Sequence, residues 1–215
     1  MKKLLLSLGL LFGLTVAASA QCVGVGGINN VPQPGITCAQ DSIVPTYAAT
    51  SIGLAPGTAP TDIACITGSA TRTIRVKQVR VSGTAGTAIN IVAVLTKHAS
   101  ANTGGTPATS TALPVPYALD SAFAAPTATT TAYTVNPTIT DASAGLISAQ
   151  TVFLPVTSTA GGAVPAVFYF DDGGPAVSPP VLRGVAQQIC VNLNGVTTPS
   201  SGLMTVTFLW NEQVQ

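Results

Sequence analysis

The side chains that could carry out chemistry are few in this chain. Its 215 residues include one histidine, His98, together with four cysteines and seven acidic residues, and only 7% of the residues are charged. A histidine that acts as a general base needs an orienting carboxylate and a nucleophile within reach. The sequence assigns neither to His98, which follows Lys97 at the end of an apolar run and has the setting of an ordinary loop histidine. We therefore predict no catalytic residues, and a protein that is not an enzyme.

The four cysteines predict disulfides rather than a metal site. Cys22, Cys38, Cys65 and Cys190 all follow a predicted export signal, and an even number of cysteines in an oxidising compartment indicates two bridges. Three pairings are open. We favour Cys22 with Cys38, which closes a short loop, and Cys65 with Cys190, which ties an early strand to a late one. Zinc is disfavoured because the chain has no CxxC pair and His98 is distant in sequence from all four cysteines.

A second candidate metal site is the pair of adjacent acids Asp171 and Asp172, which two glycines follow. Carboxylate oxygens in a flexible loop are suitable ligands for calcium, but calcium needs six or more oxygens and this loop offers few. The favoured interpretation is a turn between two strands, because Asp and Gly tolerate unusual φ values. Asp171 and Asp172 are thus a weak metal candidate, and no cofactor is predicted.

Basic side chains are concentrated in one short segment, where Arg72, Arg75, Lys77 and Arg80 lie within nine positions. Alternation along a strand places Arg75 and Lys77 on one face, with Arg80 displaced by a shift of phase. Such a basic strip could bind phosphate, a sulfated sugar or an acidic partner surface. The alternative, which we favour, is a solvated sheet face whose charges prevent edge-to-edge aggregation. Aromatic side chains do not alternate with the basic ones, so nucleic acid binding is not predicted.

The N-terminal region divides into a signal and an arm. Lys2 and Lys3 precede an apolar run, and small residues follow it, so residues 1–20 have the features of a secretory signal peptide. Residues 21–60 are rich in Gly, Pro and Asn and predict a disulfide-tethered arm. Residues 61–215 are expected to form one β-sandwich domain. No run after the signal is apolar for long enough to span a membrane.

Residues 71–97 contain the basic segment and predict two strands joined by a turn with glycine, which is a hairpin. In the first strand Ile74 and Val76 fall on one face, and the apolar set continues in the opposite phase from Val79. A period-2 pattern that slips by one residue indicates a β-bulge or a strand that passes between two sheets. Residues 88–95 are nearly all apolar, as in a strand that is covered on both sides.

Strand patterns recur through the rest of the chain at roughly ten-residue spacing. Further strands are expected at residues 62–67, 127–135, 146–156 and 163–170, and a short strand followed by a second hairpin is expected in the C-terminal third. Met204, Val206, Phe208 and Trp210 share one face of the final strand and should meet an alternating set around Ile189 in the core. About eight strands and no amphipathic helix predict an all-β fold, a two-sheet antiparallel sandwich of jelly-roll type.

Short phrases within residues 71–212 resemble a group of poorly characterised β-rich proteins encoded in bacteriophage and environmental genomes. The phrases are TRTIRVKQVRVSGTA, ANTGGT before PVPYALDS, AYTVNPT, VLRG, VNLNGVT and the closing W-x-E of Trp210 and Glu212. The resemblance implies a compact β-sandwich of virion or particle-surface type. It supplies no catalytic residues.

The export signal, the strand pattern and the missing catalytic set together predict a function. We expect an exported, non-catalytic structural or interaction subunit of a cell surface, a matrix or a phage-like particle. It would be secreted to the periplasm, the cell surface or the medium, with a virion as the alternative location. Its expected partners are further copies of itself or other surface proteins, bound through sheet edges and the arm. A binding module for glycans or an acidic polymer is the alternative, and a hydrolase is the least favoured.

Overall fold

The computed structural model describes residues 22–24, 36–38, 44–57, 61–141, 145–156, 162–170, 178–194, 196 and 201–214. The chain divides into two compact units, Met1–Ile43 and Val44–Gln215. In the first unit β1 (Cys22–Gly24) pairs antiparallel with β2 (Ile36–Cys38), and Cys22 lies opposite Cys38. This backbone register suits the expected disulfide between them, which stays a prediction. The predicted signal peptide lies outside the described residues.

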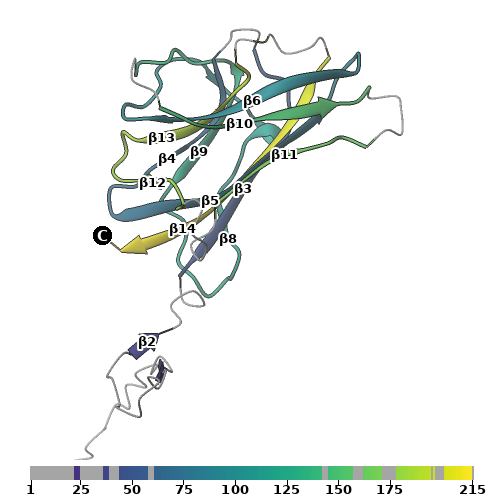
Figure 1. Cartoon of the computed structure of the whole chain (residues 1–215). Coiled ribbons are helices and arrows are strands. Elements are labelled where there is room, and N and C mark those ends of the chain that lie inside the picture. The colour runs from purple at the N-terminus through teal and green to yellow at the C-terminus, as the bar shows by residue number, and fades with distance from the viewer. Residues whose placement is uncertain are drawn as a thin grey trace, which may run out of the picture. The chain divides into compact units, whose positions relative to one another are not determined.

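The second unit is a sandwich of two antiparallel sheets, as predicted (Figure 1). The first sheet has the order β10-β6-β13-β4-β9-β7 and the second the order β11-β5-β14-β3-β8, with β12 paired to β5. The strands are β3 (Thr46–Leu54), β4 (Asp62–Thr67), β5 (Arg72–Thr84), β6 (Ile89–His98), β7 (Thr106–Pro107), β8 (Tyr117–Ala118), β9 (Thr129–Val135), β10 (Gly145–Leu154), β11 (Ala166–Tyr169), β12 (Val181–Leu182), β13 (Gln188–Asn192) and β14 (Leu203–Val214). A short 3-10 helix, η2 (Ser110–Ala112), precedes β8.

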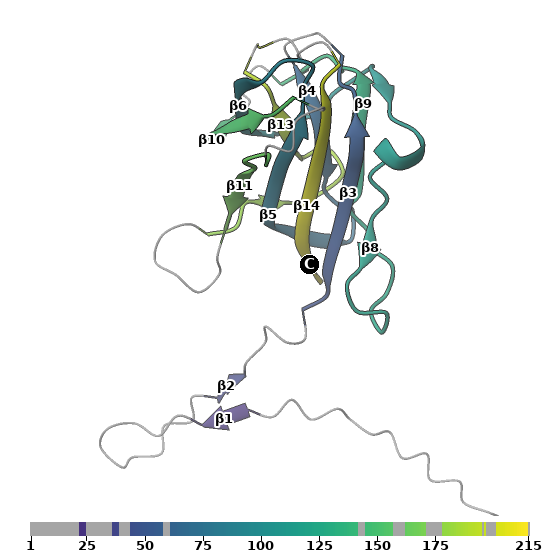
Figure 2. The same ribbon diagram turned by 90° about the vertical axis from the view of Figure 1, so that its right-hand side faces the viewer.

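The last two strands lie inside the sheets, between strands from the first half of the chain. β13 lies between β6 and β4, and β14 lies between β5 and β3 (Figure 2). Late strands inserted between early ones give the Greek-key type of connectivity that jelly rolls share. Among the described residues, no helix is long and apolar enough to cross a membrane.

The two predicted hairpins do not form. β5 and β6 lie in different sheets, and so do β13 and β14. A period-2 pattern shows which face of a strand is buried, but it does not show which strand is its neighbour. Consecutive strands here cross from one sheet to the other, so their apolar faces meet through the interior of the sandwich.

The predicted slip of phase in β5 is a β-bulge. On the neighbouring strand Leu209 lies opposite Gln78, but Trp210 lies opposite Val76, so Lys77 is the additional residue. A bulge keeps the inward face apolar on both sides of the extra residue. Consistent with this, the flanking residues Val76 and Val79 are both fully buried.

The segment predicted as an arm, residues 21–60, contains a strand of the sandwich. Residues Thr46–Leu54 form β3, which pairs with β14 on one side and with β8 on the other. Tyr47 and Ala49 alternate toward the core, a pattern that the prolines on both sides of the segment obscure in the sequence. The sandwich therefore begins near residue 44 rather than at residue 61.

The core between the sheets contains the predicted face of β14. Met204, Val206, Phe208 and Trp210 are fully buried, and they share one cluster with Ile189 of β13, as expected. Burying each large apolar side chain contributes about 1.5–3 kcal/mol. Phe153, which lies within a predicted strand, is only half-buried, because the neighbouring positions in β10 face the core.

The closing W-x-E phrase forms a buried hydrogen-bond site. The carboxylate of Glu212 is 2% exposed and accepts the indole N–H of Trp210 at 3.0 Å. It also accepts the backbone N–H groups of Thr127 and Ala128 at 2.9 and 3.0 Å, and the hydroxyl of Thr127 at 2.7 Å. Glu212 thus fixes the start of the chain segment that enters β9 against β14.

Candidate functional site

A cluster of polar side chains lies on the outer face of the first sheet. Gln188 of β13 lies directly opposite Thr67 of β4 and His98 of β6, and Cys190 lies opposite Cys65. Directly opposed residues of antiparallel strands project from the same face of the sheet. Asn102, from the loop after β6, contacts this face and makes hydrogen bonds to it. We call this set the buried polar cluster. Asp62, Cys65, His98, Gln188, Cys190 and Asn192 in it are buried, and Thr67, Thr96 and Asn102 are half-buried.

Asp62 is the acceptor at the centre of the buried polar cluster. Its side chain is fully buried, and its Oδ2 lies 3.0 Å from His98 Nε2. The side-chain amide of Asn102 donates to Oδ2 at 2.6 Å, and that of Asn192 donates to Oδ1 at 3.1 Å. Three donors therefore replace the water that a buried carboxylate loses.

His98 is not a loop histidine, in contrast to the prediction. It is the last residue of β6 and is fully buried. Its Nε2 lies 3.0 Å from Asp62 Oδ2 and also 3.0 Å from Thr96 Oγ1, whereas its Nδ1 is buried and has no hydrogen-bond partner. In a catalytic triad the acid and the nucleophile contact opposite ring nitrogens. The arrangement of His98, Asp62 and Thr96 therefore differs from a triad.

The buried polar cluster contains three types of metal-ligating atom. Ligand atoms of Asp62, His98 and Cys190 lie within 4.8 Å of one another. The sulfur of Cys190 is bonded to Cys65 and cannot act as a thiolate ligand, and the amide nitrogen of Asn102 lies 2.6 Å from Asp62 Oδ2. In the oxidised protein the three groups thus form a hydrogen-bonded cluster around an amide donor. The weak calcium candidate, Asp171 and Asp172, lies outside the described residues.

The Cys65–Cys190 disulfide is formed, which confirms the favoured pairing. It links directly opposed residues of β4 and β13 and packs with Tyr133 in a small buried group. Burial, followed by the negative charge of Asp62, raises the pKa of Tyr133 above its usual range. Tyr133 is therefore a neutral phenol at physiological pH.

A shallow hollow lies beside the end of β6, next to the buried polar cluster. It has a volume of about 300 Å³ and is lined by Lys97, Ala99, Asp141, Gly145 and Gln187. His98 does not line it and is fully buried. A substrate in this hollow would not reach the histidine, so the hollow gives no support to the hydrolase alternative.

The structure divides the predicted basic strip. Arg75 lies opposite Asn211 and Arg80 lies opposite Thr207, so the two arginines share the outer face of the second sheet, and the bulge removes the expected displacement. Arg75 Nε donates to Gln213 Oε1 at 2.9 Å, whereas Arg80 is exposed. Arg72 lies on the opposite face of β5 from Arg75. Its charge lowers the pKa of the buried Tyr47, although burial and the charge of Glu212 raise that pKa overall. Lys77 is the bulged residue.

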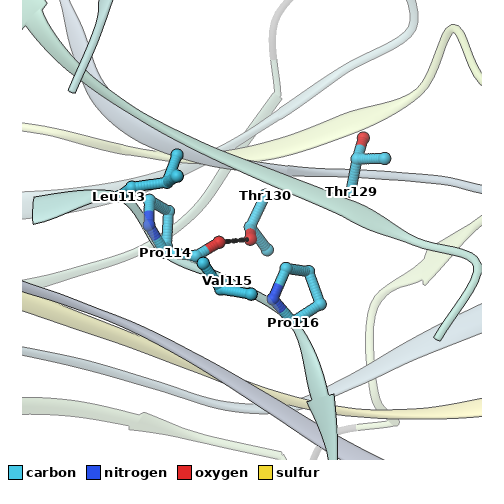
Figure 3. A pocket seen from close by; sticks show the side chains of 6 residues that line it. All are labelled: Leu113, Pro114, Val115, Pro116, Thr129 and Thr130. Atoms are coloured by element: carbon cyan, nitrogen blue, oxygen red, sulfur yellow. Dashed lines mark hydrogen bonds between the residues drawn. The ribbon is translucent and has the colours of Figure 1, made fainter. Parts of the chain in front are cut away.

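Exposed apolar side chains follow one another along residues 113–119, which include β8 and which we call the proline edge. Its exposed side chains alternate with buried or half-buried ones, and Leu113, Val115, Tyr117 and Leu119 are 41%, 61%, 52% and 54% exposed. A hollow of about 210 Å³ lies against it (Figure 3), lined by Leu113, Pro114, Val115, Pro116, Thr129 and Thr130. The Thr130 hydroxyl donates to the backbone oxygen of Pro114 and holds the segment in place.

Sequence reasoning missed most of the buried polar cluster. Gln188, Cys190 and Asn192 were recognisable as the polar half of an alternating strand, a pattern that usually faces solvent. The chain around Asn102, which contacts them, carries no pattern that predicts this. Comparisons with protein family models, curated proteins and solved structures find no match for this chain. Its function must therefore be argued from the surface and the buried polar cluster.

Proposed function

We propose that the protein is an exported, non-catalytic structural or interaction subunit of a cell surface, a matrix or a phage-like particle, which associates with further copies of itself. The observation that carries this proposal is the proline edge, with four large apolar side chains exposed within seven residues. Contiguous exposed apolar surface in a soluble domain marks a site of protein contact. Asp62 and His98 are fully buried, so this acid–base pair is closed to an external substrate.

The proline edge is suited to contact through side chains rather than through backbone pairing. β8 extends over only Tyr117–Ala118, where it pairs with β3. Pro114 and Pro116 have no N–H group, so the preceding residues cannot continue a ladder of hydrogen bonds with another strand. Association by backbone pairing, which the sequence suggested, is thus replaced here by packing of apolar side chains.

A second copy of the chain is the partner that fits this surface. Residues 98–119 contain no Lys, Arg, Asp or Glu, so the proline edge itself brings no like charges together in a pair of copies. A two-fold interface brings the same patch of each subunit together. The adjacent 210 Å³ hollow offers space for an apolar side chain of the second copy.

The edge of the first sheet that β10 forms is less suited to association. β10 has ten residues, but its pairing with β6 shifts between Leu146 and Ser148, which indicates a bulge. The backbone N–H of Phe153 in β10 donates to the backbone oxygen of Val164 at 3.2 Å, so part of this edge is covered. Bulges and covered backbone groups are features that prevent edge pairing.

The oligomeric state of the protein in solution tests this proposal. Light scattering after size-exclusion chromatography should show a dimer or larger assembly at high protein concentration, and Val115→Asp should shift the mass to that of a monomer. The matched control is Val185→Asp, because Val185 is exposed to 63% and Val115 to 61%. A wild-type monomer at all concentrations, or an equal effect of the control, would contradict the proposal.

A second candidate function is binding of an acidic polymer or sulfated glycan, which the shared outer face of Arg75 and Arg80 favours. Retention on immobilised heparin should then fall in Arg80→Ala, because Arg80 is exposed and its charge would contact the polymer. Arg183→Ala, which removes an exposed arginine elsewhere, is the control. If the association proposal alone holds, neither substitution changes retention.

A further inference from the structure

We propose that Thr67 and Gln188 become joined by an intramolecular ester bond, which cross-links β4 to β13 beside the Cys65–Cys190 disulfide. The bond would form between the hydroxyl oxygen of Thr67 and the side-chain carbonyl carbon of Gln188, with loss of ammonia. The inference rests on the buried polar cluster and does not depend on the proposed function.

The two reacting groups are already in contact. Thr67 and Gln188 are directly opposed on neighbouring antiparallel strands, and Gln188 Nε2 lies 2.9 Å from Thr67 Oγ1. Gln188 is only 6% exposed, so its carboxamide is held away from bulk water. The 2.9 Å contact joins the attacking oxygen to the leaving nitrogen, and fixing both groups on paired strands removes the entropic cost of bringing them together.

The carbonyl oxygen of Gln188 is held by a donor that suits a developing negative charge. Gln188 Oε1 accepts the backbone N–H of Asn102 at 2.9 Å. Asn102 is itself held in place through its side chain, which donates to Asp62 at 2.6 Å. A fixed backbone N–H aimed at the oxygen of a tetrahedral intermediate is the arrangement of an oxyanion hole.

A buried base lies directly beside Gln188 on the opposite side from Thr67. His98 is opposed to Gln188 on β6, and its Nε2 contacts the Asp62 carboxylate at 3.0 Å. Asp62 also accepts the side-chain amide of Asn102, whose backbone N–H donates to Gln188. We assign His98 and Asp62 as positioning residues, which hold Asn102 and its backbone N–H against Gln188.

The reaction balances without any further reagent. Thr67 Oγ1 attacks the carboxamide carbon of Gln188, and the negative charge of the tetrahedral intermediate lies on Oε1. The intermediate collapses as the C–N bond breaks, and the hydroxyl proton is transferred to the departing nitrogen. Ammonia diffuses away and is protonated in solution, and the low exposure of Gln188 limits the access of water to the ester. One C–O bond replaces one C–N bond, and no electrons are gained or lost.

Mass spectrometry of the purified full chain tests the proposal. After reduction of disulfides, the cross-linked protein should weigh about 17 Da less than its sequence, the mass of the ammonia released on acyl transfer. Proteolysis should yield one peptide pair that joins Thr67 to Gln188, and alkaline hydroxylamine should separate the pair. Thr67→Val, which keeps the shape but lacks the hydroxyl, should abolish the linked peptide, whereas Thr67→Ser should form it again.

Two further variants distinguish the reaction from other losses of ammonia. Gln150→Ala is the matched control, because Gln150 contacts only the backbone of Val167 in the described hydrogen bonds, and it should leave the 17 Da loss unchanged. His98→Gln should slow the appearance of the linked peptide in freshly refolded protein, while Thr96→Ser should not. A wild-type chain of full mass without linked peptide after prolonged incubation overturns the proposal. A linked peptide that persists in Thr67→Val, or one that resists alkaline hydroxylamine, also overturns it.

Discussion

Replacing Glu212 with alanine is expected to lower the free energy of unfolding by about 3–5 kcal/mol, because it leaves several donors buried without an acceptor. The carboxylate is 2% exposed and accepts N–H groups from Thr127, Ala128 and Trp210. Each buried donor without a partner costs about 1–3 kcal/mol. Small apolar substitutions cannot replace these bonds, so the segment that enters β9 should also lose its attachment to β14.

Urea denaturation monitored by the fluorescence of Trp210 would measure this loss. Glu212→Gln should have a smaller effect than Glu212→Ala, because one carbonyl oxygen remains as an acceptor. The control is Asp120→Ala, which removes an exposed carboxylate that accepts the N–H of Ala122 in the same region of the chain. We expect a change below about 1 kcal/mol for this control. An effect of Glu212→Ala as small as that of the control would show that the carboxylate is dispensable for stability.

The parts of the fold that were predicted from the sequence depend on local alternation. The buried face of β14 and the bulge in β5 both follow from residues within one strand, such as Phe208, Trp210 and Val79. Strand neighbours could not be predicted in the same way, because β5 and β6 are adjacent in sequence but lie in different sheets. The disulfide between Cys65 and Cys190 is a long-range contact that could be predicted, because an even number of cysteines in an exported chain indicates bridges.

The buried polar cluster could not be predicted because its members are polar residues of ordinary strands. Asp62 begins β4, His98 ends β6 and Asn102 lies in a loop, and only the folded sheet brings them together. Glu212 had a signal in the W-x-E phrase, but the phrase gave no physical role for the carboxylate. The structure supplies it, since the carboxylate accepts the indole N–H of Trp210 at 3.0 Å.

Removing the Cys65–Cys190 disulfide is expected to have an effect that depends on Thr67. In a Thr67→Val background, the pair Cys65→Ala and Cys190→Ala should lower the free energy of unfolding by about 2–5 kcal/mol, because the bridge closes a long loop in the unfolded chain. The two cysteines are separated by 125 positions in the sequence. Thr67 and Gln188 are separated by 121 positions on the same two strands, so an ester between them would close nearly the same loop.

When two cross-links close nearly the same loop, the second adds little to the restriction of the unfolded chain that the first already imposes. In protein that carries the ester, loss of the disulfide should therefore cost less than about 1 kcal/mol, and the four denaturation curves of this double-mutant cycle should show strong coupling. If no ester forms, removing the disulfide should lower the free energy of unfolding by the same amount with Thr67 as with Thr67→Val. Thr67→Val also removes the hydrogen bond of 2.9 Å between Gln188 Nε2 and the Thr67 hydroxyl. This should lower the free energy of unfolding by about 1 kcal/mol, which is too little to produce the coupling. The size of the coupling energy thus shows what fraction of the molecules carry the ester as a second cross-link between β4 and β13.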